Sequence, residues 1–270
     1  MVSPVPVVIM TSPASNWTLG GLFWTLNKYA PELQDIWVCG YDKGFFDKLR
    51  LEFAKNPGLM PKSVNFLTIG KFEEYPKSMW SDSFIKVCEY MRDNDRNHFL
   101  FLMDDFWLVR RADVRGINLL YEAMKRNNSL LKVDLATDRL YALGGLKYLY
   151  GANTFATEGH LDIIKSYCPS PYHMSFWVGL FSASLLLDHV LVPGETAQEI
   201  EVSGTGRLGD RCDDVMVVGT RQAPMRVTNL IRSGHPGQEY RGYHLGDGEW
   251  VNGIDQVDLE KMREKGVEVR

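Results

Sequence analysis

Cysteine is scarce in this sequence, and its cysteines form no recognisable pattern. The chain has 270 residues and four cysteines, which stand far apart with no C-x-x-C pair: Cys39, Cys88, Cys168 and Cys212. Structural zinc sites and disulfide frameworks both need closely patterned cysteines. The sequence therefore argues against either, and it favours a reducing cytoplasm.

Long apolar runs and blocks of charge are missing as well. No apolar run reaches the roughly 18 residues that a membrane helix needs, and the N-terminal MVSPVPVVIM is too short and too uncharged for a signal peptide. The net charge of −4 and the pI of about 5.9 give no general attraction to polyanions. The basic groups VRRADVR (109–115) and KMREK (261–265) are too short for a nucleic-acid patch and are typical of solvated helix surface. These absences predict a soluble protein without membrane insertion.

What is present is an alternation of short apolar runs and longer amphipathic stretches. It predicts strands over 5–10, 35–40, 63–69 and 98–103, and helices over 19–29, over 44–55, after a cap at Ser81 or Asp82, and from Asp113 to about 126. Strands and helices that alternate at this spacing indicate βαβ units and a mostly parallel sheet. The all-apolar FLFLM suits a central strand covered on both faces. The fold class is therefore α/β.

The pattern changes after residue 130. Short alternating runs broken by glycine and asparagine come first, and an apolar segment at 174–181 precedes a helix over 182–191. A helix or loop over 195–202, a strand over 215–220 and a helix over 255–267 complete the chain. No linker divides these segments. We therefore expect one domain over 1–270, with a nucleotide-binding half to about 130 and an acceptor-side half over 131–270.

Two adjacent carboxylates, Asp104 and Asp105, interrupt the apolar run FLFLMDDFWLV (99–109). They follow the predicted central strand, at the edge where open α/β sheets bind ligands. One interpretation is a site for Mg²⁺ or Mn²⁺, which prefer oxygen ligands. The other is a turn with one capping and one solvated aspartate, which the resumed apolar run disfavours. Since neighbouring strand residues point to opposite faces, either the chain turns here or one aspartate binds metal and the other a sugar hydroxyl.

Three long segments resemble GT-A fold glycosyltransferases, in particular bacterial and viral sugar transferases. They are VVIMTSPASNW…WTLNKYAPELQDIWVCGYDK, WSDSFIKVCEYM…HFLFLMDDFWLVRRADV and SFWVGLFSASLLLDHVLVPGETAQEIEVSGTGR. The resemblance implies a Rossmann-like mixed sheet flanked by helices, a nucleotide-diphosphate sugar donor and Mn²⁺ or Mg²⁺. The family's D-x-D motif has a DDF variant here. By analogy Asp105 is the metal ligand, and Asp104 contacts the ribose or the donor sugar.

The resemblance also implies roles for other residues. Thr11, Ser12 and Pro13 follow the first strand, where the family seats the nucleotide base, and Asp42 follows the second strand, where it contacts the nucleoside. A general base must take the acceptor's proton. Glu201, then Glu199, is the candidate in ETAQEIEV, against the alternative of a solvated helix face. A further metal ligand is expected at His244, then His235, against the alternative of a surface loop.

The segment GTGRLG (204–209) matches G-x-G-x-x-G, but it follows no long strand and opens no obvious helix. We interpret it as a flexible loop near the site, from which Arg207 and Arg211 reach the diphosphate. The neighbouring DRCDD (210–214) is either a rival metal site or, as we prefer, a turn.

The expected activity is transfer of a hexosyl or pentosyl group to an acceptor hydroxyl. The acceptor is either a glycan or a hydroxymethylated base in phage-type DNA, and the compartment is the cytoplasm, or the host cytoplasm for a viral protein. Two alternatives remain open. One is a nucleotidyltransferase, although MTSPASNWTLGG lacks the basic residue usual in its early Gly-rich loop. The other is a non-catalytic nucleotide-sugar-binding protein.

Overall fold

The first half of the chain alternates strands and helices. The computed structural model describes residues 5–56, 58–76, 79–136, 154–165, 173–209, 211, 214–230, 244–245, 249–250 and 255–268. Up to β4 the elements are β1 (Pro6–Met10), α1 (Leu19–Tyr29), β2 (Asp35–Tyr41), α2 (Lys43–Ala54), β3 (Val64–Gly70), α3 (Trp80–Asp93) and β4 (His98–Met103), with 3-10 turns η1 (Asn16–Thr18) and η2 (Phe72–Glu74). The predicted ends of these four strands agree with the observed ends within one residue.

The second half adds strands of both directions. Its elements are β5 (Phe106–Leu108), α4 (Val114–Arg126), β6 (Leu130–Asp134), β7 (Thr154–Glu158), β8 (Leu161–Lys165), β9 (Gly179–Ser182), α6 (Ala183–His189), α7 (Ala197–Leu208), β10 (Met216–Thr220), β11 (Val227–Asn229), β12 (His244–Leu245), β13 (Glu249–Trp250) and α8 (Gln256–Glu264). Asp113 caps α4 as predicted, because its carboxylate accepts a hydrogen bond from the N–H of Gly116. No helix among the described residues is long and apolar enough to cross a membrane.

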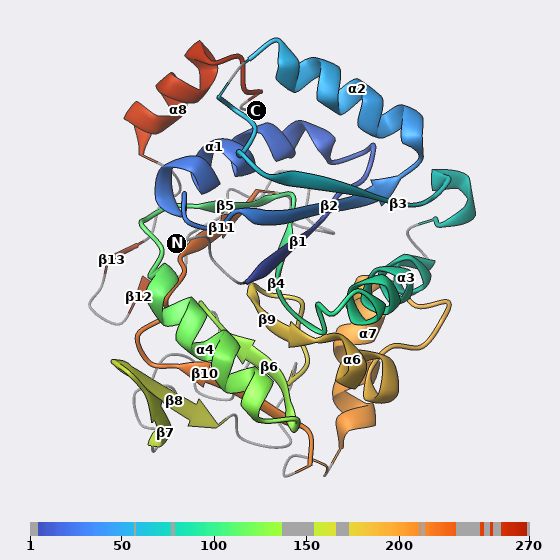
Figure 1. Cartoon of the computed structure of the whole chain (residues 1–270), viewed down its shortest axis with the longest axis vertical. Helices are drawn as coiled ribbons and strands as arrows, with labels where there is room; N and C mark the ends of the chain where they lie inside the picture. The colour runs from blue at the N-terminus through green and yellow to red at the C-terminus, as the bar shows by residue number, and fades with distance from the viewer. Residues whose placement is uncertain are drawn as a thin grey trace.

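One nine-stranded sheet joins the two halves, in the order β3-β2-β1-β4-β9-β6-β10-β8-β7 (Figure 1). β3, β2, β1 and β4 pair in parallel, and β6 pairs in parallel with β10. β9 lies between β4 and β6 and is antiparallel to both. The carboxyl ends of β1, β4, β6 and β10 therefore lie at one edge of the sheet, together with the start of β9. We call this edge the carboxyl edge.

Helices cover both faces of the sheet. Alternate strand residues face opposite sides, so Val7 and Ile9 join the core beneath α1, α2 and α4, whereas Val8 and Met10 join the core beneath α3, α6 and α7. The central strand β4 is buried on both faces, as its apolar sequence predicts. The fold is thus a mixed α/β sheet flanked by helices, which confirms the predicted fold class (Figure 1).

Two local predictions were wrong. The cap of α3 is Met79, so Ser81 and Asp82 lie in the first turn of the helix. There they bind the segment before α7: Ser81 Oγ accepts from the N–H of Glu195, and Asp82 accepts from the N–H of Gly194. The expected loop over 204–209 is also absent, because α7 continues through Leu208.

Candidate functional site

The two aspartates after β4 occupy a buried turn. Asp104 is 4% exposed and Asp105 is 6% exposed. The N–H of Asp104 donates to the carbonyl of Met10, and the carbonyl of Asp105 accepts from the N–H of Leu230. β5 begins at the next residue, so the chain turns at the aspartates. This is one of the two alternatives that their adjacency in the sequence left open. Burying two adjacent carboxylates is costly unless hydrogen bonds or cations compensate their charge.

Hydroxyl groups from the segment after β1 hold Asp104. Its Oδ2 accepts hydrogen bonds from Thr11 Oγ1 at 2.7 Å and from Ser15 Oγ at 2.6 Å. Burial raises the pKa of Asp104 to about 7, although these two hydroxyls favour the charged form. The carboxyl therefore sits near its ionisation midpoint at neutral pH, and a nearby cation would draw it toward the charged form.

The other predicted residues of the nucleotide side lie close to these hydroxyls or after β2. Ser12 Oγ lies 2.9 Å from Ser15 Oγ, which places Ser12 in the same hydroxyl cluster. Pro13 is exposed in the turn that follows. Asp42 is exposed and caps α2, where its carboxylate accepts from the N–H of Phe45 at 2.7 Å. The structure thus brings Thr11 and Ser12 to Asp104, whereas the Asp42 carboxylate is engaged with its own helix.

β6 carries a buried ion pair that the sequence patterns did not predict. Lys132 is fully buried, and its Nζ lies 2.6 Å from Asp134 Oδ1. The ammonium also donates to the carbonyl of Ser175 at 2.7 Å and to Ser175 Oγ at 2.9 Å. The signal was visible in LLKVDL, where a lysine and an aspartate two residues apart interrupt a buried strand and must share one face.

The two candidate bases on α7 have different surroundings. Glu199 is part of the capping box with Thr196, and the hydrogen bonds of that box lower its pKa. Glu201 Oε1 accepts from the N–H of Phe176 at 2.7 Å. Burial raises the pKa of Glu201, while the Phe176 N–H and the positive charge of Lys132 oppose that rise. Of the two, only Glu201 lies against residues that lead to the carboxyl edge.

The two predicted arginines are engaged with other partners. Arg207 makes a two-point ion pair with Glu195, at 2.9 and 2.7 Å, and donates to the carbonyl of Val190. Arg211 lies near His189 of α6 and shortly before β10. Because β10 runs parallel to β6, its first residue lies at the opposite edge of the sheet.

The described residues of this site would hold a divalent cation together with ligands from a substrate. Among the described residues, no group of three His, Cys, Asp or Glu side chains is arranged to hold a metal ion. Mg²⁺ is commonly bound by one or two carboxylates together with substrate phosphates, and the pair Asp104 and Asp105 suits that mode. His244 pairs with Trp250 between β12 and β13, but its side chain lies outside the described part of the structure, as do His235 and most of 210–213.

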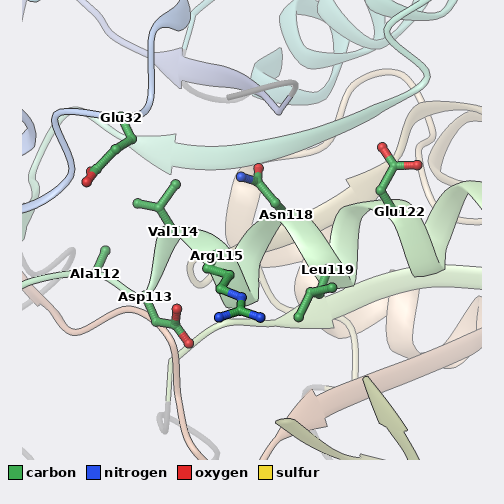
Figure 2. Close-up of a pocket in the computed structure, with 8 residues that line it drawn as sticks. All are labelled: Glu32, Ala112, Asp113, Val114, Arg115, Asn118, Leu119 and Glu122. Atoms are coloured by element: carbon green, nitrogen blue, oxygen red, sulfur yellow. The ribbon is translucent and has the colours of Figure 1, made fainter. Parts of the chain in front are cut away.

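A surface pocket lies at the start of α4 and contains none of these residues (Figure 2). Its lining is Glu32, Ala112, Asp113, Val114, Arg115, Asn118, Leu119 and Glu122. Asp113 is occupied by the helix cap and by His160, and Glu32 is paired with Arg111. The acidic groups of this pocket thus have structural partners, and the carboxyl edge remains the candidate site.

Comparisons with known proteins concern the fold. No family model and no curated protein matches the sequence. Solved structures with similar folds include TarS 1–349 of S. aureus (TM-score 0.46, 12% identity, covering 83% of this chain and 59% of that one). Others are the glycosyltransferase GlyE of Streptococcus pneumoniae (0.33, 14%, 67% and 35%) and a cytidylyltransferase of Leptospira borgpetersenii (0.37, 12%, 69% and 63%). This chain spans about three fifths of the TarS and cytidylyltransferase chains.

Proposed function

We propose that this chain is a metal-dependent glycosyltransferase that moves a sugar from a nucleotide-diphosphate donor to an acceptor hydroxyl. The observation that carries the proposal is the buried turn at Asp104 and Asp105, at the carboxyl end of the central strand β4. Thr11 and Ser15, from the segment after β1, bind one of its two carboxylates. Ligands of open α/β sheets bind at this edge.

The two aspartates have different roles in this proposal. Asp105 is the metal ligand, and Asp104, oriented by its two hydroxyl partners, contacts the ribose or the donor sugar. A bound Mn²⁺ or Mg²⁺ would neutralise the charge of the diphosphate leaving group. His244 is a proposed further metal ligand. The nucleoside side of the donor site is formed in this proposal by Thr11, Ser12, Pro13 and Asp42.

Glu201 is the proposed general base. During transfer the bond between the sugar's anomeric carbon and the diphosphate oxygen breaks, and a bond to the acceptor oxygen forms. The acceptor hydroxyl loses its proton, which the Glu201 carboxylate accepts. Its burial supports this role, because a raised pKa makes a carboxylate a stronger base near neutral pH. Glu199 is exposed and engaged in the cap of α7.

The acceptor in this proposal is a glycan or a hydroxymethylated base in DNA, bound by the half of the domain over 131–270. The half over 1–130 holds the donor. Incubation with each acceptor in the same assay separates the two classes, since only one is expected to receive labelled sugar.

A donor panel tests the proposal. The protein is incubated with Mn²⁺ and UDP-, GDP-, CDP- or dTDP-sugars, and nucleotide release and sugar transfer are followed. We expect one donor to be consumed, Asp105→Asn to lower the rate at least 100-fold, and Glu201→Gln to lower it about 100-fold while donor binding is retained. Glu199→Gln is the matched control and keeps the wild-type rate, because glutamine also serves in a capping box. A wild-type rate in Asp105→Asn would exclude the metal role.

Two additions to the panel separate the alternatives: a nucleoside triphosphate with a sugar phosphate as substrates, and thermal unfolding as a readout. Given a nucleoside triphosphate and a sugar phosphate, a nucleotidyltransferase would join the nucleotidyl group to the sugar phosphate and release pyrophosphate, and it would transfer no sugar from the nucleotide-sugar panel. A non-catalytic binding protein would be stabilised against heat by one nucleotide sugar and would leave it intact. Either result would replace the glycosyltransferase proposal.

A further inference from the structure

Residues 173–178, which we call the bridging segment, connect α7 to the turn at Asp105. The segment leads into β9, and its Trp177 packs against Phe106 with ring centroids 4.8 Å apart. Phe106 is the residue directly after Asp105. The carbonyl of Val178 accepts a hydrogen bond from the N–H of Leu135, just beyond β6. The segment therefore packs against the residue that directly follows the two aspartates.

Three consecutive residues of the bridging segment are held by side chains from two different elements. From α7, Thr205 Oγ1 accepts from the N–H of Met174 at 3.0 Å, and Glu201 accepts from the N–H of Phe176 at 2.7 Å. From β6, Lys132 donates to both oxygens of Ser175. The hydrogen bonds of Lys132 and Glu201 thus meet on neighbouring residues.

The packing around Lys132 leaves its ammonium little freedom. The side chain passes beside β9 at Gly179, where an added Cβ would lie 3.0 Å from Lys132 Cε and 3.0 Å from the carbonyl oxygen of Val133. Its Nζ lies 5.2 Å from the ring centroid of Phe181 and pairs with Asp134. An ammonium that is fully buried is costly unless it is paired and hydrogen-bonded. Lys132 is paired with Asp134 and hydrogen-bonded to Ser175, so its ammonium is compensated and lies against the bridging segment.

We propose that Lys132 is a positioning residue that fixes the bridging segment between α7 and the Asp105 turn and places a positive charge next to Glu201. The inference rests on the proposed role of Glu201 as the base. In it Asp134 holds the ammonium in place and partly offsets its charge. Lys132 touches neither donor nor acceptor, and it acts on the reaction through Ser175 and Glu201.

Other charged groups on the elements around α7 have different partners. Asp82 of α3 binds the N–H of Gly194, and His189 of α6 lies near Arg211. His173 is buried within the bridging segment itself. Lys132 is the charged side chain that opposes the burial-induced rise in the pKa of Glu201. Removing the positive charge of Lys132 should therefore raise the pKa of Glu201, and removing the negative charge of Asp134 should lower it.

The test follows the Glu201 carboxyl directly, by NMR titration of protein labelled with ¹³C at the Asp and Glu carboxyl carbons. Glu201→Gln identifies the signal. We expect Lys132→Met to raise the pKa of Glu201, because a nearby positive charge favours the carboxylate, and Asp134→Asn to lower it, because the ammonium loses the opposing negative charge. Thr205→Val removes an uncharged anchor of the same segment and should leave the pKa unchanged.

Asp134→Asn keeps the fold measurable if Lys132→Met fails to fold, because asparagine still accepts from the ammonium. Equal pKa values of Glu201 in the wild type and in every folded variant of Lys132 and Asp134 would overturn the proposal. The titration needs no substrate, so it remains decisive even if the donor panel finds no activity. With the donor that the panel selects, Lys132→Met should lower kcat at least 10-fold and change the KM for the donor less than twofold.

Discussion

Asp104 shows how one buried side chain makes stability depend on pH. Burial raises its pKa to about 7, whereas the same carboxyl ionises near pH 4 in an unfolded chain. Between these values the folded protein keeps a proton that the unfolded chain has released. The free energy of unfolding of the metal-free protein therefore falls as the pH rises from about 4 to about 7.

Asp104→Asn tests this dependence. Asparagine keeps an oxygen for the hydroxyls of Thr11 and Ser15 but carries no charge. We expect the variant to raise the free energy of unfolding by about 2–4 kcal/mol at pH 8 and to change it little at pH 4. Urea unfolding with EDTA present measures both values. Asp93→Asn, at an exposed aspartate, is the control and should have a small effect at both pH values. A gain for Asp104→Asn that is equal at both pH values would contradict the assignment.

At the scale of elements, the contact between α1 and β5 depends on one glycine. A Cβ at Gly21 would lie 2.0 Å from Trp107 Cζ2, while the indole N–H of Trp107 donates to the carbonyl of Thr18 at 2.8 Å. Alanine at position 21 must displace the indole and break that hydrogen bond. We expect Gly21→Ala to lower the free energy of unfolding by about 3 kcal/mol, measured by urea denaturation.

Gly20 provides the matched control on the same helix. A Cβ there would meet other atoms at 3.7 Å or more, which is ordinary contact. Because alanine favours a helix over glycine, Gly20→Ala should raise the free energy of unfolding by about 0.5–1 kcal/mol. If the two variants were equally stable, the close approach at Gly21 would not matter to the fold.

α7 shows where a local pattern misleads. The segment GTGRLG, with Gly204, Gly206 and Gly209, was interpreted as a loop, yet it is helical through Leu208. The capping box starts the helix, and the burial of Ile200 and Leu208 holds its length. Gly204 is close-packed, because a Cβ there would lie 3.0 Å from Val190 Cγ1. The sequence shows glycine's low helix propensity, but it does not show this tertiary contact.

At the scale of the whole molecule, a buried carboxylate of α8 binds the front of the chain, beside the apolar contacts of Met262 and Val267. Asp258 is 2% exposed and binds both Lys28 and Tyr29 of α1. Burial alone would raise the pKa of Asp258, but the hydrogen bonds and the positive charge of Lys28 outweigh burial and lower it. A lowered pKa means that this stabilisation is present above about pH 4 and is lost as the pH falls through the folded value.

Asp258→Ala should therefore destabilise the protein by about 1–3 kcal/mol at pH 7 and by less at pH 3. Thermal unfolding at the two pH values measures the difference. In a double-mutant cycle with Lys28→Met the two losses should not add, because both variants remove the same contact. Additive losses would show that the docking of α8 does not depend on this pair.

The sequence by itself determined the α/β class, the first four strands, and the position of Asp104 and Asp105 at the end of a central strand. These features follow from local sequence patterns: apolar β-branched runs predict strands, and capping residues and the spacing of apolar residues predict helices. The adjacency of the two aspartates left open whether the chain turns there or the two side chains have different roles, and the structure shows the turn. Their roles toward a metal and a sugar remain predictions.

Only the tertiary structure decided which side chains gather around that turn. β9 enters antiparallel between β4 and β6, and it carries the bridging segment to Phe106 on one side and to Lys132 and Glu201 on the other. Arg207 instead pairs with Glu195. The order of strands in a sheet depends on the packing of segments far apart in the chain, which local periodicity does not encode. For that reason the sequence LLKVDL did not reveal the role of Lys132, whose partners Asp134 and Ser175 are known only from the tertiary structure.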